Sequence, residues 1–238
     1  MKLLSAYTSN NGVRIHYLDS HSFADDQFPP IIICPGLSET AEEYADLIEY
    51  LLPRRSIALS FRGRGQSDTP TEGYDLEEHT SDIESVLRAT NIQAFHLFTY
   101  SRGVSYALRF AQKQPSSILS LILGDYPPEH RKMSAEWAED YIQHYLEPHH
   151  RLGHIRPEAV RAIQRESTQI ALHEMMRFPV LVTKGMLEDS LISETDLQSY
   201  NEICTNLSIK CFQLSGHGIK MTEKELFYES IQDFLKRN

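Results

Sequence analysis

Short runs of apolar residues alternate with amphipathic segments along most of the chain. Seven runs rich in β-branched and apolar residues predict strands at 13–18, 31–34, 56–60, 95–100, 118–124, 180–184 and 209–214. Between them, apolar residues at positions 44, 47, 48 and 51, and again at 83, 86 and 87, recur with the spacing of one helix face. A last helix is expected from about position 222. This alternation predicts an α/β fold with a mostly parallel central sheet flanked by helices.

One segment interrupts the alternation of strands and helices. Between positions 128 and 178 no run predicts a strand, whereas 135–146 and 158–176 are compatible with helices. We therefore expect a core made of residues 1–127 and 179–238, with 128–178 as a helical insertion. The insertion holds seven Lys and Arg against eight Asp and Glu, so nearly all of the chain's net charge lies in the core.

Composition and charge narrow the class of protein. The chain has 238 residues, 41% of them hydrophobic, and a net charge of −10. That length can bury one large core, and the acidity argues against nucleic acid and anionic membranes as partners. Three cysteines without C-x-x-C spacing are typical of free thiols in a reducing compartment. With no signal-peptide core and no apolar run of about 20 residues, we expect a cytoplasmic protein.

The sharpest local motif lies where the strand 95–100 runs directly into a helical segment. Residues 98–105 read F-T-Y-S-R-G-V-S, which is typical of a nucleophile elbow, a tight strand-to-helix turn that exposes one side chain. Here that side chain is Ser101. At the start of a helix, the dipole and the free N–H groups favour the negative charge that develops when a hydroxyl attacks a carbonyl.

Five motifs in this order resemble the α/β-hydrolase superfamily, and together they cover essentially the whole chain. They are P-G at 35–36, R-G-R-G-Q-S-D at 62–68, the elbow at Ser101, the acidic segment 185–192, and S-G-H-G at 215–218. The chain order serine, acid, histidine is the one expected for that fold. The resemblance implies an α/β-hydrolase fold with a cap insertion.

The resemblance also implies a catalytic triad. Ser101 would be the nucleophile and His217 the general base, because an imidazole can take and return a proton near neutral pH. For the acid, two adjacent carboxylates follow the strand 180–184. The common G-x-x-D spacing falls on Glu188, whereas the following S-L-I fits Asp189 better. We favour Asp189, with Glu188 as the alternative acid.

The resemblance implies that the oxyanion hole consists of the backbone N–H groups of Leu37 and Arg102. Three positions depart from the superfamily pattern. Cys34 stands where a histidine often braces the loop before Pro-Gly, Ser60 replaces the usual aspartate, and Thr99 replaces the first glycine of the elbow. Because the oxyanion donors are backbone groups, a change of side chain at position 34 does not by itself abolish the hole. Cys34 ends a buried run, which favours a packing role.

Within the insertion, three aromatic residues are the candidates for the substrate pocket under the cap: Trp137, Tyr141 and Tyr145. Histidines 150 and 154 have the i, i+4 spacing of metal ligands, but no H-E-x-x-H motif accompanies them. We therefore expect no metal site and no cofactor.

Three functions fit these residues. The preferred hypothesis is a serine hydrolase of a small ester, lactone or related carbonyl compound, which forms an acyl-enzyme at Ser101. An alternative is cleavage or elimination at a C–C bond, with Arg102 and Arg109 pairing with a substrate carboxylate, although we favour Arg102 as a solvated helix residue. The third is a non-catalytic binding or signalling protein on the same scaffold. The partner expected for either enzyme is a small-molecule substrate.

Overall fold

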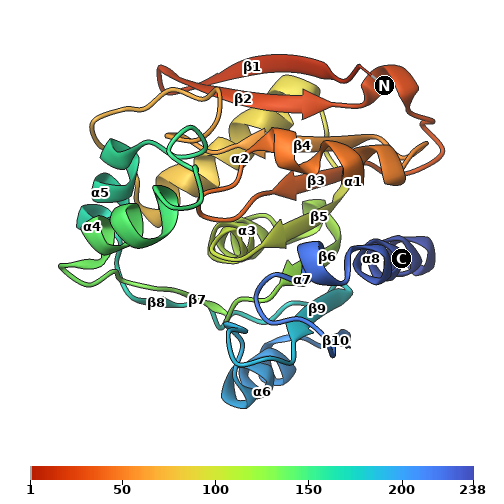
Figure 1. The fold of residues 1–238 in the computed structure, drawn as a ribbon. Coiled ribbons are helices and arrows are strands. Elements are labelled where there is room, and N and C mark those ends of the chain that lie inside the picture. Colours follow the sequence, from red (N-terminus) through yellow and green to blue (C-terminus); the bar gives the residue numbers. More distant parts are fainter. Residues whose placement is uncertain (1) are drawn as a thin grey trace.

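The computed structural model describes residues 2–238, and its centre is one eight-stranded sheet. The strand order is β1-β2-β4-β3-β5-β6-β9-β10 (Figure 1). All neighbouring pairs from β4 to β10 are parallel, whereas β1 pairs antiparallel with β2, and β2 with β4. The strands are β1 (Leu4–Asn10), β2 (Val13–Asp19), β3 (Ile31–Cys34), β4 (Ser56–Ser60), β5 (Phe95–Tyr100), β6 (Ile118–Gly124), β9 (Val180–Gly185) and β10 (Leu207–Phe212).

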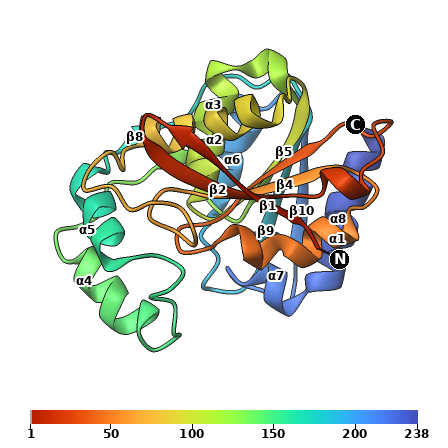
Figure 2. The ribbon, with the colours of Figure 1, turned by 90° about the horizontal axis from the view of Figure 1, so that it is seen from above.

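Helices cover both faces of the sheet, so the core forms three layers (Figure 2). One apolar cluster joins the sheet to α2 (Leu76–Thr90), α3 (Gly103–Lys113) and α6 (Glu194–Ile203). A second cluster joins the other face to α1 (Ala45–Tyr50) and α8 (Lys224–Arg237). Shorter helical segments are η1 (His21–Phe23), η2 (Ala41–Tyr44), η3 (Pro115–Ser117) and α7 (Ile219–Thr222).

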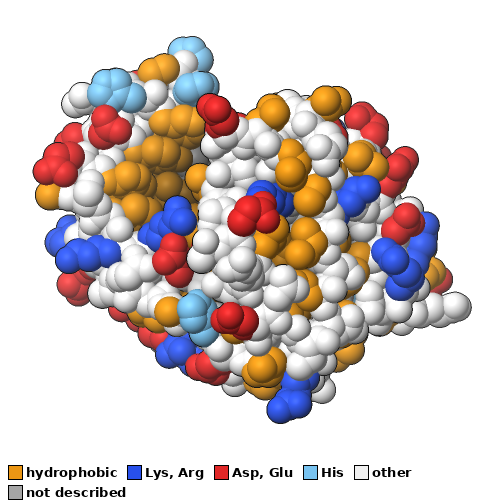
Figure 3. Space-filling model, turned by 90° about the horizontal axis from the view of Figure 1, so that it is seen from below, with side chains coloured by type: hydrophobic (Ala, Val, Ile, Leu, Met, Phe, Trp, Pro, Cys, Tyr) orange, Lys and Arg blue, Asp and Glu red, His pale blue; other side chains and the backbone are white. Residues whose placement is uncertain are grey.

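Between β6 and β9 the chain leaves the sheet and forms the insertion. It contains β7 (Glu129–His130), α4 (Trp137–Tyr141), the π-helical turn η4 (Ile142–Leu146), α5 (Pro157–Glu166) and β8 (Ile170–Ala171). A third apolar cluster packs α4, η4 and α5 against each other and against Tyr74 of the core. On the face seen in Figure 3, hydrophobic side chains line a hollow, and a group of histidines lies at its upper border in this view.

The strands predicted from apolar runs agree with the structure, apart from one further residue at the end of β2 and of β9 and a shift of two residues at β10. The sequence reasoning missed β1, whose exposed and half-buried residues alternate at the sheet edge, so no apolar run marks it. The prediction of a strand-free insertion is wrong, because β7 and β8 form a two-residue ladder. The helix expected over 158–176 ends at Glu166, since the chain becomes extended from Ser167 to reach that ladder.

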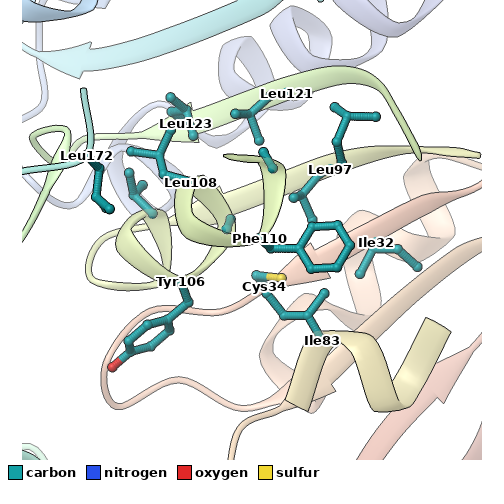
Figure 4. Packing of buried hydrophobic residues seen from close by; sticks show 14 of the residues in the cluster. Ile32, Cys34, Ile83, Leu97, Tyr106, Leu108, Phe110, Leu121, Leu123 and Leu172 are labelled. Carbon is teal, nitrogen blue, oxygen red and sulfur yellow. The ribbon is translucent and has the colours of Figure 1, made fainter. Parts of the chain in front are cut away.

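Cys34 lies in the core, as its position at the end of a buried run predicts. It is 0% exposed and belongs to the apolar cluster shown in Figure 4, where it lies among Ile32, Ile83 and Phe110. Burial raises the pKa of its thiol well above the ordinary value. The thiol therefore stays neutral, which fits packing and argues against a role as nucleophile.

Candidate active site

Ser101 sits in a strained turn between β5 and α3. Its φ is +52°, in the left-handed region that residues with a side chain rarely adopt. Its N–H donates to the carbonyl oxygen of Gly124 at 2.7 Å, and its own carbonyl accepts from Val104 at 2.8 Å. These bonds hold the turn on both sides, and such strain is stored at functional sites. The turn has the geometry of a nucleophile elbow.

Glycine is required next to Ser101 because two backbone segments approach closely. A β-carbon on Gly103 would lie 2.3 Å from the carbonyl oxygen of Pro35, and one on Gly36 would lie 3.1 Å from Cβ of Ser101. The start of α3 therefore packs directly on the residues that follow β3. We call residues 34–37 the oxyanion loop.

His217 lies opposite the serine, in the loop after β10. Its Nε2 is 3.0 Å from Oγ of Ser101. Its Nδ1 is 2.8 Å from Oδ2 of Asp125. A carboxylate accepts at Nδ1, so Nδ1 carries the proton and Nε2 is free to accept the serine proton. The structure thus brings the two predicted residues Ser101 and His217 together, with a third residue that the sequence reasoning did not single out.

Asp125 follows β6 directly and is completely buried. Besides His217, its carboxylate accepts from the N–H of Gly185 at 3.2 Å, the hydroxyl of Ser190 at 2.6 Å and the N–H of Leu191 at 3.0 Å. Four hydrogen bonds satisfy the buried carboxylate and fix its direction. Its φ of +42° is one that aspartate tolerates better than most residues.

The structure does not pair Asp189 or Glu188 with the imidazole, which corrects the expectation for the acid. Both side chains are exposed. The carboxylate of Asp189 accepts from the backbone N–H of His217 at 3.3 Å and lies against Gly216, where a β-carbon would be 1.5 Å from Oδ1. Asp125 occupies Nδ1 instead, because β6 lies next to β5 in the sheet and ends at the same edge.

The backbone N–H groups of the two predicted oxyanion donors have no hydrogen-bond partner among the described residues. Leu37 and Arg102 lie outside the helices and strands, and neither backbone N–H donates a hydrogen bond within residues 2–238. The carbonyl oxygen of Leu37 accepts from Nε of Arg64 at 2.9 Å, which fixes the peptide plane after Leu37. Two free N–H groups beside a serine match the requirement for stabilising an oxyanion.

The side chain of Arg102 is buried, at 2% exposure, so the expectation of a solvated helix residue is wrong. Its Nε donates to the hydroxyl of Tyr106 at 3.2 Å, and its Nη1 donates to the carbonyl of Arg131 at 3.1 Å. Nη2 lies 3.3 Å from Nε2 of His130, and burial together with the arginine charge lowers the pKa of His130 to about 3. All these partners are neutral.

A second buried guanidinium lies beside the first. Arg64 is fully buried, and its Nη2 has no hydrogen-bond partner among the described residues. Among the ion pairs of residues 2–238, neither Arg64 nor Arg102 has a carboxylate. Arg109, by contrast, pairs with Glu77 at 2.7 Å on the surface. Two buried guanidinium groups therefore lack a carboxylate partner among the described residues, whereas Arg109 has one.

The three aromatic candidates of the insertion form one stacked row. Trp137 and Tyr141 stack with ring centroids 5.3 Å apart, and Tyr141 and Tyr145 with centroids 5.0 Å apart. The hydroxyl of Tyr141 donates to Oγ of Ser38 at 2.9 Å, directly after the oxyanion loop. Leu37 packs against the same apolar cluster as Trp137 and Tyr141. The row therefore adjoins the oxyanion loop.

The histidines of the insertion make no metal site in the structure. Nδ1 of His154 is 2.9 Å from Oε2 of Glu43, and Nδ1 of His149 is 2.8 Å from the carbonyl of Tyr145. In residues 2–238 no group of three or more potential ligands could hold a metal ion. In the same part of the chain, no helix has both the length and the apolar character needed to cross a membrane.

Comparison with known proteins identifies the fold. A family model for the alpha/beta hydrolase fold matches residues 29–143. The chain is an α/β-hydrolase-fold protein. It is 22% identical to N-formylmaleamate deformylase of Pseudomonas putida, over 95% of this chain and 94% of that protein. It is 24% identical to a putative carbamate hydrolase of Variovorax paradoxus, over 94% and 96% of the two chains.

Solved structures show the same α/β-hydrolase fold. An esterase from Exiguobacterium antarcticum matches with a TM-score of 0.79 at 20% identity, over 98% of this chain and 100% of that one. These relatives are hydrolases of the α/β superfamily.

The structure accommodates the three departures from the α/β-hydrolase pattern. Cys34 packs in the core, as described above. Oγ of Ser60 accepts from the N–H of Ala41 at 2.9 Å, so it still makes a turn contact. Oγ1 of Thr99 is buried without a partner and lies where a β-carbon on Gly103 would be 2.8 Å away. None of the three touches the hydrogen bonds of Ser101, His217 and Asp125.

Proposed function

We propose that this α/β-hydrolase-fold protein is a serine hydrolase that cleaves a small ester, lactone or related carbonyl compound through an acyl-enzyme at Ser101. The observation that carries the proposal is the hydrogen-bonded chain from Oγ of Ser101 through His217 to Asp125. This arrangement has the three roles of a nucleophile, a general base and an orienting acid.

In the proposed mechanism, His217 takes the proton of Ser101 as the serine oxygen attacks the substrate carbonyl. Asp125 holds the imidazole in the required tautomer and stabilises the imidazolium that forms. The N–H groups of Leu37 and Arg102 donate to the oxyanion of the tetrahedral intermediate. His217 then protonates the leaving group, and water hydrolyses the acyl-enzyme by the same steps in reverse order.

The aromatic row supports a substrate with an apolar or planar part. We propose that the insertion is a cap, and that Trp137, Tyr141 and Tyr145 line the alcohol or acyl pocket beside the oxyanion loop. Aromatic rings offer large apolar contact areas to such groups. A deformylase, a putative carbamate hydrolase and an esterase are among the similar proteins, which supports hydrolysis of a carbonyl compound.

The experiment that tests this function is a screen of p-nitrophenyl esters and lactones across acyl length and charge, with Ser101→Ala as the blank. The proposal predicts turnover by the wild-type protein and a loss of about 10⁴-fold or more in the variant, in line with the loss of a triad nucleophile. A Ser101→Ala protein that hydrolyses p-nitrophenyl acetate at the wild-type rate would contradict it.

A second candidate concerns the charge of the substrate. Arg102, which follows Ser101 in the chain, and Arg64 are both buried without carboxylate partners among residues 2–238, and a buried cation gains most from an anion. This favours a substrate that carries a carboxylate, as expected for the C–C hydrolase and lyase alternative, and leaves Arg109 out of it. Comparison of a neutral ester with a hemisuccinate ester, in Arg102→Met and Arg109→Met, distinguishes the two. A larger loss for the charged ester, confined to Arg102→Met, supports the second candidate.

A further inference from the structure

A second buried network reaches the site, and Glu39 is its centre. The side chain of Glu39 is only 15% exposed. Its Oε2 accepts from the backbone N–H of Gly36 at 2.7 Å and from the hydroxyl of Tyr44 at 2.5 Å. Its Oε1 forms an ion pair with the ammonium group of Lys220. One carboxylate thus joins the oxyanion loop, the η2 segment and the loop after His217.

We propose that Glu39 and Lys220 are positioning residues, which hold the oxyanion loop in register with the catalytic histidine. Neither side chain touches the reacting atoms in this account. They act through Gly36 at one end and through the His217 loop at the other. The proposal rests on the proposed hydrolase function, because it assigns these residues to the geometry of that same site.

At the oxyanion loop, the network holds Gly36, which lies between Glu39 and Ser101. A β-carbon on Gly36 would lie 3.0 Å from Oε2 of Glu39 and 3.1 Å from Cβ of Ser101. By accepting from the N–H of Gly36, Glu39 fixes the peptide one residue before the oxyanion donor of Leu37. Cys34, which stands at the position of the usual bracing histidine, makes no hydrogen bond through its thiol within residues 2–238. Glu39 supplies this bracing.

At the histidine end, Lys220 follows His217 by three residues, in α7. Its ammonium lies 4.3 Å from the ring centroid of Tyr44 and 5.6 Å from that of Tyr100, so two aromatic faces hold it. The hydroxyl of Tyr100 donates to the carbonyl of His217 and accepts from the N–H of Ile219 at 3.1 Å. The residue before the nucleophile and the Glu39–Lys220 pair therefore fix the same loop.

Charge makes this link stronger than a neutral hydrogen bond. Burial alone raises the pKa of Glu39, but the charge of its ion-pair partner Lys220 and the hydrogen bonds from Tyr44 and Gly36 together hold it below its ordinary value. The carboxylate is therefore ionised at neutral pH. Removal of either partner leaves a mostly buried charge without compensation, and the free carboxylate or ammonium then draws in water and moves the loop that carries it.

The chain provides a matched control, an ion pair that would only stabilise the fold. Asp46 and Lys224 form a second carboxylate–lysine ion pair between the same two parts of the chain, a few residues further along each. They are 49% and 42% exposed. The other partners of Asp46, the N–H of Leu47 and the hydroxyl of Tyr228, do not belong to the oxyanion loop. If the Glu39–Lys220 ion pair only stabilised the fold, its loss and the loss of the Asp46–Lys224 ion pair would have equal effects.

The test compares Glu39→Gln and Lys220→Met with Asp46→Asn and Lys224→Met in the full chain, using p-nitrophenyl acetate and a boronic acid whose oxygen mimics the oxyanion. Loss of a whole oxyanion donor costs about 10²- to 10³-fold in kcat. Because the donor is displaced rather than removed, we expect kcat to fall by about 10- to 100-fold in Glu39→Gln, with KM changed by less than about twofold. Boronic acid affinity should fall with kcat. The control pair should change kcat by less than about twofold.

Equal effects of the two pairs would overturn the proposal, as would a rise in KM with kcat unchanged. Lys220→Arg keeps the charge and should recover most of the kcat that Lys220→Met loses, so this comparison decides the matter if Glu39→Gln does not fold. Failure of the proposed function would look different, because the wild-type protein would then neither hydrolyse the esters nor bind the boronic acid.

Discussion

Replacement of Asp125 by asparagine is the sharpest single perturbation of the site. Asparagine keeps the size of the side chain and tolerates the φ of +42° at this position. It removes the negative charge beside Nδ1 of His217, 2.8 Å away. In triads of this kind, the same change lowers kcat by about 10⁴-fold. We expect a loss of about 10³- to 10⁴-fold, which corresponds to about 4 to 5.5 kcal/mol at 1.36 kcal/mol per decade.

The surroundings of Asp125 predict a cost in stability as well. All four groups that its carboxylate binds are N–H or O–H donors. The hydroxyl of Ser190 can turn to accept, and His217 can accept at Nδ1 in its other tautomer, but the N–H groups of Gly185 and Leu191 cannot. An asparagine NH₂ on either side of the carboxamide therefore faces one of these two N–H groups. An unsatisfied buried donor costs about 1 to 3 kcal/mol. Chemical denaturation should show a loss of that size in the free energy of unfolding.

The assay is steady-state hydrolysis of p-nitrophenyl acetate by folded protein, with Asp189→Asn and Glu188→Gln as controls. Both control side chains are exposed, and within residues 2–238 the carboxylate of Asp189 makes a hydrogen bond only with the backbone N–H of His217. We expect each control to keep kcat within about threefold of wild type, as for most exposed positions. If Asp189→Asn lost more than a hundredfold while Asp125→Asn stayed near wild type, the assignment of the acid would be refuted.

Three further predictions follow from packing and burial. Gly103→Ala places a methyl group 2.3 Å from the carbonyl oxygen of Pro35 and should cost about 1 to 3 kcal/mol of stability and most of the activity. Gly218→Ala is the control, because the space around its β-carbon is open, and thermal melts should show little loss of stability. Tyr141→Phe should leave small esters unaffected, while Tyr141→Ala should raise KM several-fold for esters with large apolar groups if the row lines the pocket. Burial lowers the pKa of His96 to about 4, below the unfolded value of about 6.5, so stability is lost as pH falls through that window. When the pH is lowered from 7.5 to 5, the free energy of unfolding should fall by about 2 kcal/mol less in His96→Gln than in the wild type. Equal falls in the two proteins would contradict this.

The fold is readable from the sequence because its central strands are buried on both faces. β3, β4, β5 and β9 consist entirely of buried residues, so each includes neighbouring apolar residues rather than a strict apolar–polar alternation. An edge strand leaves a weaker signal in the sequence, and β1 was missed because its exposed and half-buried residues form no apolar run. The elbow and the glycine-flanked histidine are likewise local, since a few consecutive residues determine each turn.

The acid could not be chosen from spacing because the choice depends on three-dimensional packing. Asp125 and Asp189 both follow strands that end at the same edge of the sheet. What separates them is the course of the loop after β9, which turns Asp189 to the backbone at Gly216 and brings Ser190 and Leu191 to Asp125. The signal that was present is an aspartate directly after the buried strand next to the nucleophile strand.

The buried role of Arg102 and the Glu39–Lys220 pair were also beyond the sequence. Arg102 directly precedes α3, where charged residues are usually solvated, and the segment around β7 covers its side chain. Glu39 and Lys220 are 181 positions apart in the chain. Nothing local marks either as buried, and their contact arises only when the loops after β3 and β10 meet at the edge of the sheet.

The most direct test of the account is mass spectrometry of the protein after reaction with a fluorophosphonate probe. A probe of this kind reacts with a serine only where a base activates it and an oxyanion hole stabilises the product. The account predicts one adduct per chain on the peptide that contains Ser101, absent in Ser101→Ala and formed far more slowly in Asp125→Asn than in Asp189→Asn. An unlabelled Ser101 in folded wild-type protein, or an adduct at another residue, would contradict the central claim.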